Sequence, residues 1–425
     1  MSKIVLGVTS GIAAYKMLDL VAILKKANHG ITVLMTRSAR KIVSPADIKE
    51  LTGENVFIEL FPPNFSKSKI LKNRKIDHVE IAKFADIFVV APATANSIAK
   101  MANGIADDFI TTTLLATQAP TLICPSMNDL MWYHPATQKN LQIIRSFGYE
   151  ILEPESGALA CGTDGIGRLP KVSVISAKIE EILARKKMLA GKKVLVTGGG
   201  TLEPIDEARV ITNRSSGLMG KALAESAYRF GSEVTFLHAK NATTSHLPIE
   251  QVSFVTSKEL TDFLTFRLSD FNIVFHSAAV SDFIVSKVDG KIKSDNPHDL
   301  HLETTGKIIN EIKKINPKIT LVGFKAISFS SYEKVKGSHP EPVEGSKKDK
   351  NWIPDQVRND SLKLFKDAGA DFVVVNDISR KDIGFESTDN EVYLVSKDEK
   401  IVKIEKAPKS KIASEIIKTI YTIGV

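Results

Sequence analysis

Cysteine and tryptophan are both scarce, with two of each among 425 residues. So few cysteines exclude the disulfide framework that small secreted domains use, and they predict a reducing compartment. No apolar run approaches the ~18 residues that a membrane-spanning helix needs. The opening Met1-Ser2-Lys3, followed by a strand-like run, lacks the apolar segment and cleavage site of a secretory signal. We therefore expect a cytoplasmic chain without membrane segments.

Charge is plentiful but is not concentrated in one place. The 57 Lys and Arg residues against 49 Asp and Glu give a formal net charge of +8. The lysines gather near 66–75, 185–193 and 347–350 without interleaved aromatic residues, whereas a nucleic-acid surface normally shows a concentrated stripe or a known module. The excess charge suits phosphorylated small molecules, and we expect no nucleic-acid partner.

The first half alternates short β-branched runs with helical patterns. Apolar spacing predicts a helix over 12–28. Near-continuous apolar strands with helices between them are typical of a parallel sheet covered on both faces. The fold class is therefore α/β, and we expect a doubly wound, flavodoxin-like domain over residues 1–190. Its strands are expected at 3–9, 31–36, 86–92, 120–125 and 149–153.

A second domain is expected to begin near residue 190. The charged amphipathic stretch 176–193 predicts a helix ending at Gly191, after which the opening pattern of lysine, buried strand and glycine turn recurs. Residues 191–425 thus predict a second doubly wound, Rossmann-like domain. Strands are expected at 192–199, 233–238, 251–255, 271–276, 319–324 and 371–376, helices at 217–230, 257–268 and 307–315, and then a strand pair at 391–396 and 401–405 before a C-terminal helix.

Residues 337–360 interrupt this second pattern. They contain three prolines and only four apolar side chains. Such a segment cannot bury enough apolar surface to offset the entropy of ordering, so we expect an inserted flexible loop. A short functional lid is the alternative that loop statistics leave open.

Two turns after predicted strands carry small and hydroxylated residues. Ser10 and Gly11 follow the first strand, and Thr36 and Ser38 follow the second. Glycine permits close backbone approach, hydroxyls donate to phosphate oxygens, and helix N-termini favour anions. Since ligands bind at the switch point of a doubly wound sheet, we expect a nucleotide-like phosphate here. For either turn alone, an ordinary βα turn without a ligand is an equally good interpretation.

Four further polar residues lie at or beside the same predicted edge. Thr94 and Asn96 follow the third strand with small side chains that leave room for a ring or a ribityl chain. Asn128 follows the fourth strand, and its amide N–H groups can bind a carboxylate. His78 lies near the start of a helix just upstream, where a lone histidine is more often a cap or a surface residue.

A glycine-rich segment surrounds Cys161. Four glycines between 157 and 167 predict a mobile flap with the thiol near its centre. Cys161 would then reach a bound substrate, as an acid or a nucleophile must. Cys124 lies within the fourth predicted strand and is expected to be inert.

In this order the motifs resemble those of the flavin-containing cysteine decarboxylase family. They are S-G-I-A-A-Y-K, D-H-V-E, A-P-A-T-A-N, P-x-M-N-x-x-M-W and A-C-G followed by G-I-G-R. With the second domain, nearly the whole chain except 337–360 resembles the family that joins phosphopantothenoylcysteine decarboxylase to phosphopantothenate–cysteine ligase. Several ordered motifs beside a matching partner domain make the resemblance specific.

The resemblance implies FMN as a cofactor and roles for three side chains. In that family, FMN oxidises the cysteine moiety to a thioaldehyde, which eases loss of the adjacent carboxylate, and the electrons then return to the enethiolate. His78 would act in the oxidative decarboxylation, Asn128 would hold the substrate carboxylate, and Cys161 would protonate the product carbon. The flap would close over the site. The residues expected at the cofactor are Ser10, Gly11, Thr36, Ser38, Thr94 and Asn96.

The motifs of the second domain resemble a ligase that activates 4'-phosphopantothenate with CTP and Mg²⁺, so that the amine of cysteine can attack. Asn213, in I-T-N-R-S-S-G-L-M-G, would attend the acyl-nucleotide intermediate, and Asp282 and Lys291 would bind the cytidine nucleotide. A lysine there can neutralise phosphate charge during transfer. The sequence assigns no metal ligand. The other expected nucleotide contacts are His276, Ser277, Ala278, Lys307, Ile308, Ile309, Asn310 and Phe324.

The ligase half departs from that family's pattern at three places. The run 325–328 (Lys-Ala-Ile-Ser) lacks an acidic residue usual there, and the 305–310 loop lacks the common proline and acidic residue. Two lysines expected on the helix before Asp371 are out of register, which leaves open whether Lys363 and Lys366 replace them. A decarboxylase with an impaired ligase half is therefore one alternative.

Two other functions stay open at this point. A flavin prenyltransferase-like protein would share the FMN fold but lack the Cys161 flap and the ligase domain. A non-catalytic flavoprotein regulator would bind a phosphatase, and the intact His78, Asn128 and Cys161 argue against it. The resemblance also implies a homo-oligomer, with trimer-based packing of flavin domains and dimerising ligase domains.

Overall fold

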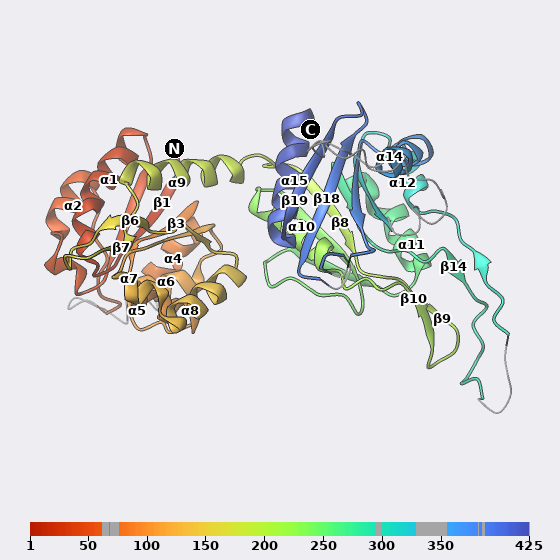
Figure 1. Cartoon of the computed structure of the whole chain (residues 1–425), viewed down its shortest axis with the longest axis horizontal. Coiled ribbons are helices and arrows are strands. Elements are labelled where there is room, and N and C mark those ends of the chain that lie inside the picture. Colours follow the sequence, from red (N-terminus) through yellow and green to blue (C-terminus); the bar gives the residue numbers. More distant parts are fainter. Residues whose placement is uncertain are drawn as a thin grey trace, which may run out of the picture. The chain divides into compact units, whose positions relative to one another are not determined.

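The chain folds into two compact units, Met1–Arg185 and Lys186–Val425 (Figure 1). The computed structural model describes residues 1–61, 68, 76–293, 299–328, 355–380, 382–384 and 387–424. Within those residues, no helix combines the length and the apolarity needed to cross a membrane. Most of the predicted insert, up to residue 354, lies outside the described residues.

The first unit is built on five parallel strands. They are β1 (Lys3–Val8), β2 (Gly30–Met35), β3 (Ile87–Ala93), β4 (Thr121–Pro125) and β5 (Glu150–Ile151). Their order in the sheet is β2-β1-β3-β4-β5, and every neighbouring pair is parallel. The order turns round between β1 and β3, which makes this the switch point of a flavodoxin-like topology. The expected doubly wound α/β class is confirmed.

Alternate residues of these strands face two different cores. Leu6 and Val33 pack with the helices on one face, whereas Val5 and Phe88 pack with those on the other. A short 3-10 turn, Ile12–Lys16, precedes the first helix, where the sequence predicted one continuous helix. One face carries α1 (Met17–Lys26), α2 (Pro45–Thr52) and α9 (Val172–Lys186), and the other carries α4 (Asp77–Phe84), α5 (Ala95–Ala102), α6 (Phe109–Ala116), α7 (Asp129–Tyr133) and α8 (Pro135–Ser146).

The predicted flap is an antiparallel hairpin. Its strands are β6 (Glu155–Ala158) and β7 (Asp164–Arg168), and the turn between them carries Cys161. Arg168 pairs with Glu155 across the hairpin at 2.9 Å. The four glycines lie in this hairpin and its turn.

The second unit is built on an eight-stranded sheet. Its strands are β8 (Lys193–Gly198), β11 (Glu233–Ala239), β12 (Glu250–Phe254), β13 (Ile273–His276), β16 (Thr320–Ile327), β17 (Phe372–Asp377), β18 (Asp389–Ser396) and β19 (Ile401–Pro408). The order is β12-β11-β8-β13-β16-β17-β18-β19, parallel as far as β17 and antiparallel beyond it. The six parallel strands follow the Rossmann order, with the switch point between β8 and β13.

Two small antiparallel ribbons extend from this unit (Figure 1). One pairs β9 (Leu202–Pro204) with β10 (Val210–Thr212), and the other pairs β14 (Phe283–Ile284) with β15 (Glu303–Thr304). The sequence did not predict either ribbon, because each strand has only two or three residues. Both begin at carboxyl ends of central strands and so belong to the ligand-binding edge.

Helices cover both faces of the second sheet. Two predicted helix boundaries were wrong: α9 ends at Lys186 rather than at Gly191, and residues 355–360 belong to a helix rather than to a flexible insert. Val357 is fully buried in the apolar core beneath the second of these helices, and this burial anchors the first turn of that helix. The helices are α10 (Leu218–Arg229) and α15 (Lys409–Gly424) on one face, and α11 (Ser257–Arg267), α12 (Ile309–Ile315) and α14 (Asp355–Ala368) on the other.

Candidate active sites

A hollow of about 530 Å³ lies at the carboxyl edge of the first sheet, beside its switch point. Gly11 after β1, Thr94 after β3 and Asn128 after β4 line it, and Cys161 reaches it from the hairpin turn. A Cβ added to Gly11 would lie 3.2 Å from the ring of Pro92, so the backbone of this turn lies close against β3. A volume of this size is in the range of small-molecule sites.

A second hollow of about 440 Å³ adjoins the first, because neighbouring residues line the two. Ser10, Thr36, Ser38 and Asn96 line the second, while Gly11 and Thr94 line the first. All six residues expected at the cofactor are thus brought together at one sheet edge, within two adjoining hollows.

The polar groups of the second hollow suit a phosphate mainly through hydroxyls. Its two basic side chains both pair with carboxylates: Arg37 Nε lies 2.7 Å from Glu59 Oε1, and Lys100 Nζ lies 2.7 Å from Asp107 Oδ1. The hydrogen bond from Arg37 lowers the pKa of Glu59. The hydroxyls lining this hollow supply uncharged donors, which bind phosphate oxygens as helix N-termini do.

Cys161 and Asn128 are in direct contact. Asn128 Nδ2 donates to Cys161 Sγ at 3.2 Å, and Thr163 Oγ1 lies 3.2 Å from the same sulfur. Hydrogen bonds from Thr163 and Asn128 lower the pKa of the exposed Cys161 thiol. Asn128 Oδ1 accepts from the N–H of Leu130 at 2.9 Å at the start of α7, which turns the amide N–H groups toward the thiol.

Cys124 is the opposite case. It is fully buried within β4, and burial raises the pKa of its thiol. A protonated thiol without access to the hollow has no nucleophilic role.

His78 does not reach this hollow within one copy of the chain. It lies on α4, half-buried, with its ring edge-on to Phe109 at 6.3 Å between centroids. It lines neither the hollow at Cys161 nor the adjoining one. The structure therefore brings Asn128 and Cys161 together but places His78 elsewhere.

Gly167 fixes the hairpin against the loop that carries Asn128. Its carbonyl accepts from the N–H of Met127 at 3.0 Å, and a Cβ added there would lie 2.0 Å from Met127 O. We expect Gly167→Ala to lower the free energy of unfolding of the first unit by about 3 kcal/mol. Since the hairpin must move away, the pKa of Cys161 should rise toward that of an unperturbed cysteine.

The measurement is the pH dependence of Cys161 alkylation, combined with thermal unfolding. Gly104→Ala is the matched control, because Gly104 also has a positive φ of 67° but has nothing within 4 Å of the added Cβ. It should cost about 1–2 kcal/mol through backbone strain and leave the thiol unchanged. An unaltered Cys161 titration in Gly167→Ala would contradict the fixing role.

The second unit has a smaller hollow, of about 150 Å³, at its own sheet edge. Its walls come from the start of α10 (215–220), from the segment after β13 (277–279) and from Phe324 on β16. Ser277, Ala278 and Phe324 were expected at the nucleotide. Asn376, Asn390 and Lys409 also line the hollow and were missed, although Asn376 near the end of β17 fits the same strand-end rule.

Asn213 joins two loops at this edge. Its Nδ2 donates to the carbonyls of Ala279 and Val280, both at 3.1 Å. Ser277 Oγ donates to Thr197 O at 2.6 Å and ties the same segment to β8. Asn213 therefore shapes the segment after β13, in addition to any contact it makes with a ligand.

The other expected nucleotide residues do not line the small hollow. The N–H of Thr305 donates to Asp282 O at 3.0 Å, which brings the 276–282 and 305–310 segments together. Lys307 and Lys291 are exposed, Ile308 is buried and Ile309 is half-buried. The buried Oδ1 of Asn310 has no hydrogen-bond partner among the described residues. Lys363 and Lys366 are exposed on α14.

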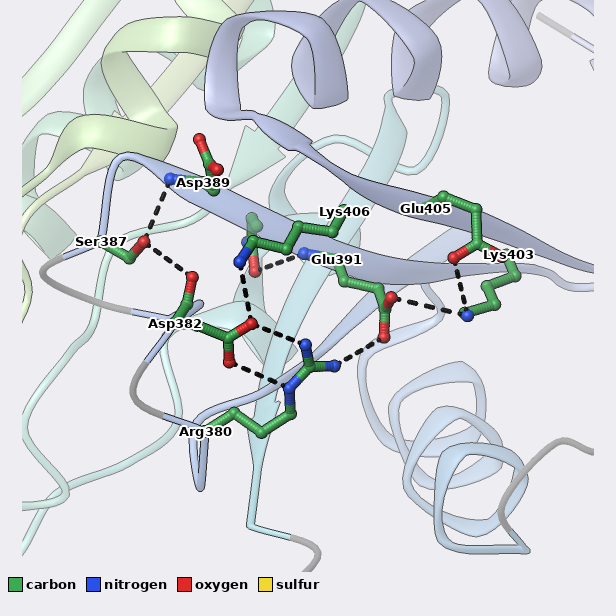
Figure 2. Close-up of polar contacts among 9 residues, drawn as sticks. Arg380, Asp382, Ser387, Asp389, Glu391, Lys403, Glu405 and Lys406 are labelled. Atoms are coloured by element: carbon green, nitrogen blue, oxygen red, sulfur yellow. Dashed lines mark hydrogen bonds and ion pairs between the residues drawn. The ribbon is translucent and has the colours of Figure 1, made fainter.

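A cluster of ion pairs fastens the chain segment that carries Gly384, part of the same wall (Figure 2). Asp382 pairs with Arg380 at 2.8 Å and with Lys406 at 2.9 Å, and these partners hold the pKa of Asp382 well below its usual range. Lys409 Nζ donates to Gly384 O at 2.8 Å, and burial lowers the pKa of Lys409 to about 8. The first residue of α15 is thus joined to the wall of the hollow.

His276 is a buried part of the sheet rather than a wall of the hollow. Its Nδ1 lies 3.1 Å from Thr197 Oγ1, and burial lowers its pKa to about 4. An unfolded histidine titrates near 6.5. Between these two pH values the unfolded state binds more protons than the folded state. The stability contributed by the neutral His276 is therefore fully present above pH 6.5, and the free energy of unfolding falls as the pH drops below that value.

We expect that loss to reach about 2–3 kcal/mol at pH 4.5. Hydrogen exchange of the β13 amides at pH 7.5 and 4.5 measures it, with allowance for the intrinsic exchange rates. His276→Gln, which cannot titrate, should show a smaller loss of protection. Equal losses in both proteins would show that His276 does not carry this pH dependence.

Comparison with known families covers nearly all of the chain. Residues 1–184 match the family model described as Flavoprotein, and residues 189–338 and 354–423 match the one described as DNA/pantothenate metabolism flavoprotein C-terminal domain. The gap within the second match, residues 339–353, falls inside the segment that the sequence marks as an insert.

Several curated proteins align over their full length. A Vibrio vulnificus (strain CMCP6) protein is 34% identical over 423 residues, 99% of this chain and 98% of its own. A Bacillus subtilis (strain 168) protein is 34% identical over 429 residues, covering 99% and 97%. Both are described as coenzyme A biosynthesis bifunctional protein CoaBC. A crystal structure of the C-terminal domain of such a protein covers 56% of this chain and 97% of that one, at 25% identity and a TM-score of 0.42.

Proposed function

The chain belongs to the family of coenzyme A biosynthesis bifunctional proteins, and from this membership we propose the reaction of each unit. The second unit ligates 4'-phosphopantothenate to cysteine with CTP, and the first decarboxylates the product to 4'-phosphopantetheine. The observation that carries the decarboxylase assignment is the contact between Asn128 and Cys161 in a hollow at the switch point. A lost ligase half is not favoured, since the C-terminal family match continues on both sides of the insert.

We propose that FMN occupies the two adjoining hollows of the first unit. Ser10, Thr36 and Ser38 would hold its phosphate, and Thr94 and Asn96 would hold the remainder. The donor set fits, because hydroxyls gather in one hollow while the other is roomy and reaches the thiol. When bound, FMN supplies reversible two-electron oxidation and reduction of the substrate's cysteine moiety.

Asn128 and Cys161 bind the substrate carboxylate and donate the proton. Asn128 presents its amide N–H groups where the substrate carboxylate has to bind and at the same time polarises the Cys161 sulfur. Cys161 donates a proton to the product carbon, and the hydrogen bonds that lower its pKa make it a stronger acid for this step. The hairpin that carries it excludes water from the reacting group.

In the second unit, the carboxylate of 4'-phosphopantothenate attacks the α-phosphorus of CTP and pyrophosphate leaves. The amine of cysteine then attacks the acyl carbon, and CMP leaves with the carboxylate oxygen. Asp282 is bonded to the 305–310 segment through its carbonyl, and the exposed Lys291 would neutralise phosphate charge. Mg²⁺ usually binds through substrate phosphates and few protein ligands, so we place it on the CTP triphosphate.

We propose that the chain works as a homo-oligomer in the cytoplasm, with trimer-based first units and dimerising second units. Exposed apolar side chains surround the hollow at Cys161, including Ile12 (62% exposed) and Leu130 (77%). A second copy packed there would cover them and offers a way for His78 to complete the site. A reducing compartment would keep Cys161 a free thiol.

The visible absorption spectrum of the purified full chain tests the first assignment. We expect bound flavin, and CO₂ release when 4'-phosphopantothenoylcysteine is added. A colourless protein that takes up no FMN would contradict the assignment. For the second unit, the test is pyrophosphate release from CTP, which should depend on 4'-phosphopantothenate.

A further inference from the structure

The carboxylate of Asp206 is the centre of a hydrogen-bonded joint between two ribbons of the second unit. It lies between β9 and β10, and its side chain is 0% exposed. Oδ1 accepts from the N–H groups of Ala208 and Arg209, each at 2.7 Å. Oδ2 accepts from Arg209 Nη1 at 2.7 Å and from the N–H of Ile292 at 3.1 Å. One buried carboxylate therefore joins its own turn to a residue 86 positions later.

Ile292 is the immediate neighbour of Lys291, and the other contacts of the joint also flank this lysine. The N–H of Val288 donates to Ile205 O at 2.9 Å, and the N–H of Glu207 donates to Gly290 O at 3.3 Å. Arg209 Nη1 donates to Ile292 O at 3.1 Å as well. The backbone is thus held on both sides of Lys291, whose own side chain is exposed.

These hydrogen bonds, rather than an apolar core, hold the segment in place. Ile205 and Ile292, the apolar residues of the joint itself, are only half-buried. Val210 and Val288 beside them are 47% and 46% exposed. Burial alone would raise the pKa of Asp206, but hydrogen bonds from Ala208, Ile292 and Arg209 outweigh it and hold the pKa at about 2. The carboxylate is therefore ionised at every working pH.

We propose that Asp206 is a positioning residue for Lys291 in the ligase reaction. This inference rests on the proposed function, in which Lys291 binds the nucleotide. A lysine on a free ribbon would lose much side-chain and backbone entropy on meeting the phosphates, whereas a fixed backbone leaves only the side chain to order. Asp206 supplies that preorganisation without touching the substrate.

The experiment is a double-mutant cycle on the full chain with Asp206→Asn, Lys291→Gln and the two combined. With the amide oxygen on the N–H groups of Ala208 and Arg209, the Nδ2 that replaces Oδ2 can accept neither from the N–H of Ile292 nor from Arg209 Nη1, so the joint opens on the Lys291 side. We expect kcat/KM for CTP in pyrophosphate release to fall about 10–100-fold in Asp206→Asn. In the Lys291→Gln background the same change should cost no more than about twofold, because the group being positioned is gone.

Glu203→Gln is the matched control. Glu203 is a second buried carboxylate on the same ribbon, in β9, but it accepts from Ser257 N at 2.9 Å and not from the Lys291 segment. Its effect, whatever its size, should be the same with and without Lys291. Hydrogen exchange should also show faster exchange at 288–292 in Asp206→Asn, with the β8 and β13 amides unchanged.

Three results would overturn the proposal, and they are distinguishable. If Lys291→Gln leaves ligation unchanged, the proposed role of Lys291 fails and the inference fails with it. If Lys291→Gln is impaired but Asp206→Asn is not, or if their losses multiply in the double variant, only the inference fails. If Asp206→Asn unfolds the β8 and β13 core, Arg209→Ala, which removes the Nη1 bonds to Asp206 and Ile292, takes its place in the same cycle and is judged by the same outcomes.

Discussion

Replacing Cys161 by serine is expected to lower formation of 4'-phosphopantetheine by ~10²-fold or more, with ligation unchanged. A positioned general acid contributes a factor of this size, and an alcohol is a far weaker acid than a thiol. The thiol is already tuned for the task, since Thr163 and Asn128 lower its pKa from either side. The assay is CO₂ and product formation from supplied 4'-phosphopantothenoylcysteine, with pyrophosphate release followed in parallel.

The lowered pKa of Cys161 also predicts that the rate of product formation depends on pH. The thiol can donate only while it is protonated, so product formation should decline as the pH rises through the lowered pKa of Cys161. Thr163→Val removes the largest of the lowering hydrogen bonds and should move this decline to higher pH. Cys124→Ala is the control, because the buried Cys124 lines no hollow, and it should leave the profile unchanged. Full activity of Cys161→Ser would exclude the thiol as the proton donor.

Replacing Lys291 by glutamine is expected to reduce pyrophosphate release by ~10²–10³-fold, the range found when one preorganised group at a developing charge is removed. The neutral amide keeps a similar length but cannot neutralise phosphate charge. Decarboxylation of supplied 4'-phosphopantothenoylcysteine should be unchanged, since the first unit contains its own hollow and thiol.

Lys287→Gln is the matched control for this prediction. Lys287 is exposed in the segment between β14 and β15, four residues before Lys291. A general loss of positive potential would weaken ligation in both variants by similar factors. Equal losses would therefore contradict a specific role for Lys291, whereas a loss confined to Lys291→Gln supports contact with the nucleotide.

The parallel sheets and the first site's residues are predictable from the sequence because the relevant signals are local. Apolar runs such as 86–92 identify strands that are buried on both faces. Since the carboxyl ends of parallel strands share one edge, Ser10, Thr36 and Thr94 could be placed together without knowledge of any contact. The apolar runs therefore predict where the strands lie, and the shared edge predicts which side chains lie near one another.

The features that escaped prediction depend on long-range contacts. The pairing of β6 with β7 around Cys161 was not predicted, and the close approach of Gly167 to Met127 leaves no local signal beyond a glycine. The buried Asp206 joins residues 86 positions apart. Lys409 reaches the hollow of the second unit only because β18 and β19 turn back along the sheet and lead into α15.

Burial also decided which expected residues line a hollow. His276 ends a strand with a polar side chain, as a ligand contact would, but its ring points into the sheet and bonds Thr197. Val357 stands alone in a polar stretch, yet it is buried and begins a helix. His78 has its ring against Phe109 and lines neither hollow of the first unit, so its role stays a prediction.

The most direct test of the whole account uses cysteine labelled in its carboxyl carbon. The purified chain is incubated with labelled cysteine, 4'-phosphopantothenate, CTP and Mg²⁺, and labelled CO₂ is collected. The account predicts CO₂ release in step with pyrophosphate, abolished when either CTP or 4'-phosphopantothenate is omitted. Release that is independent of CTP, or pyrophosphate formation without any CO₂, would contradict the claim that one chain carries out both reactions.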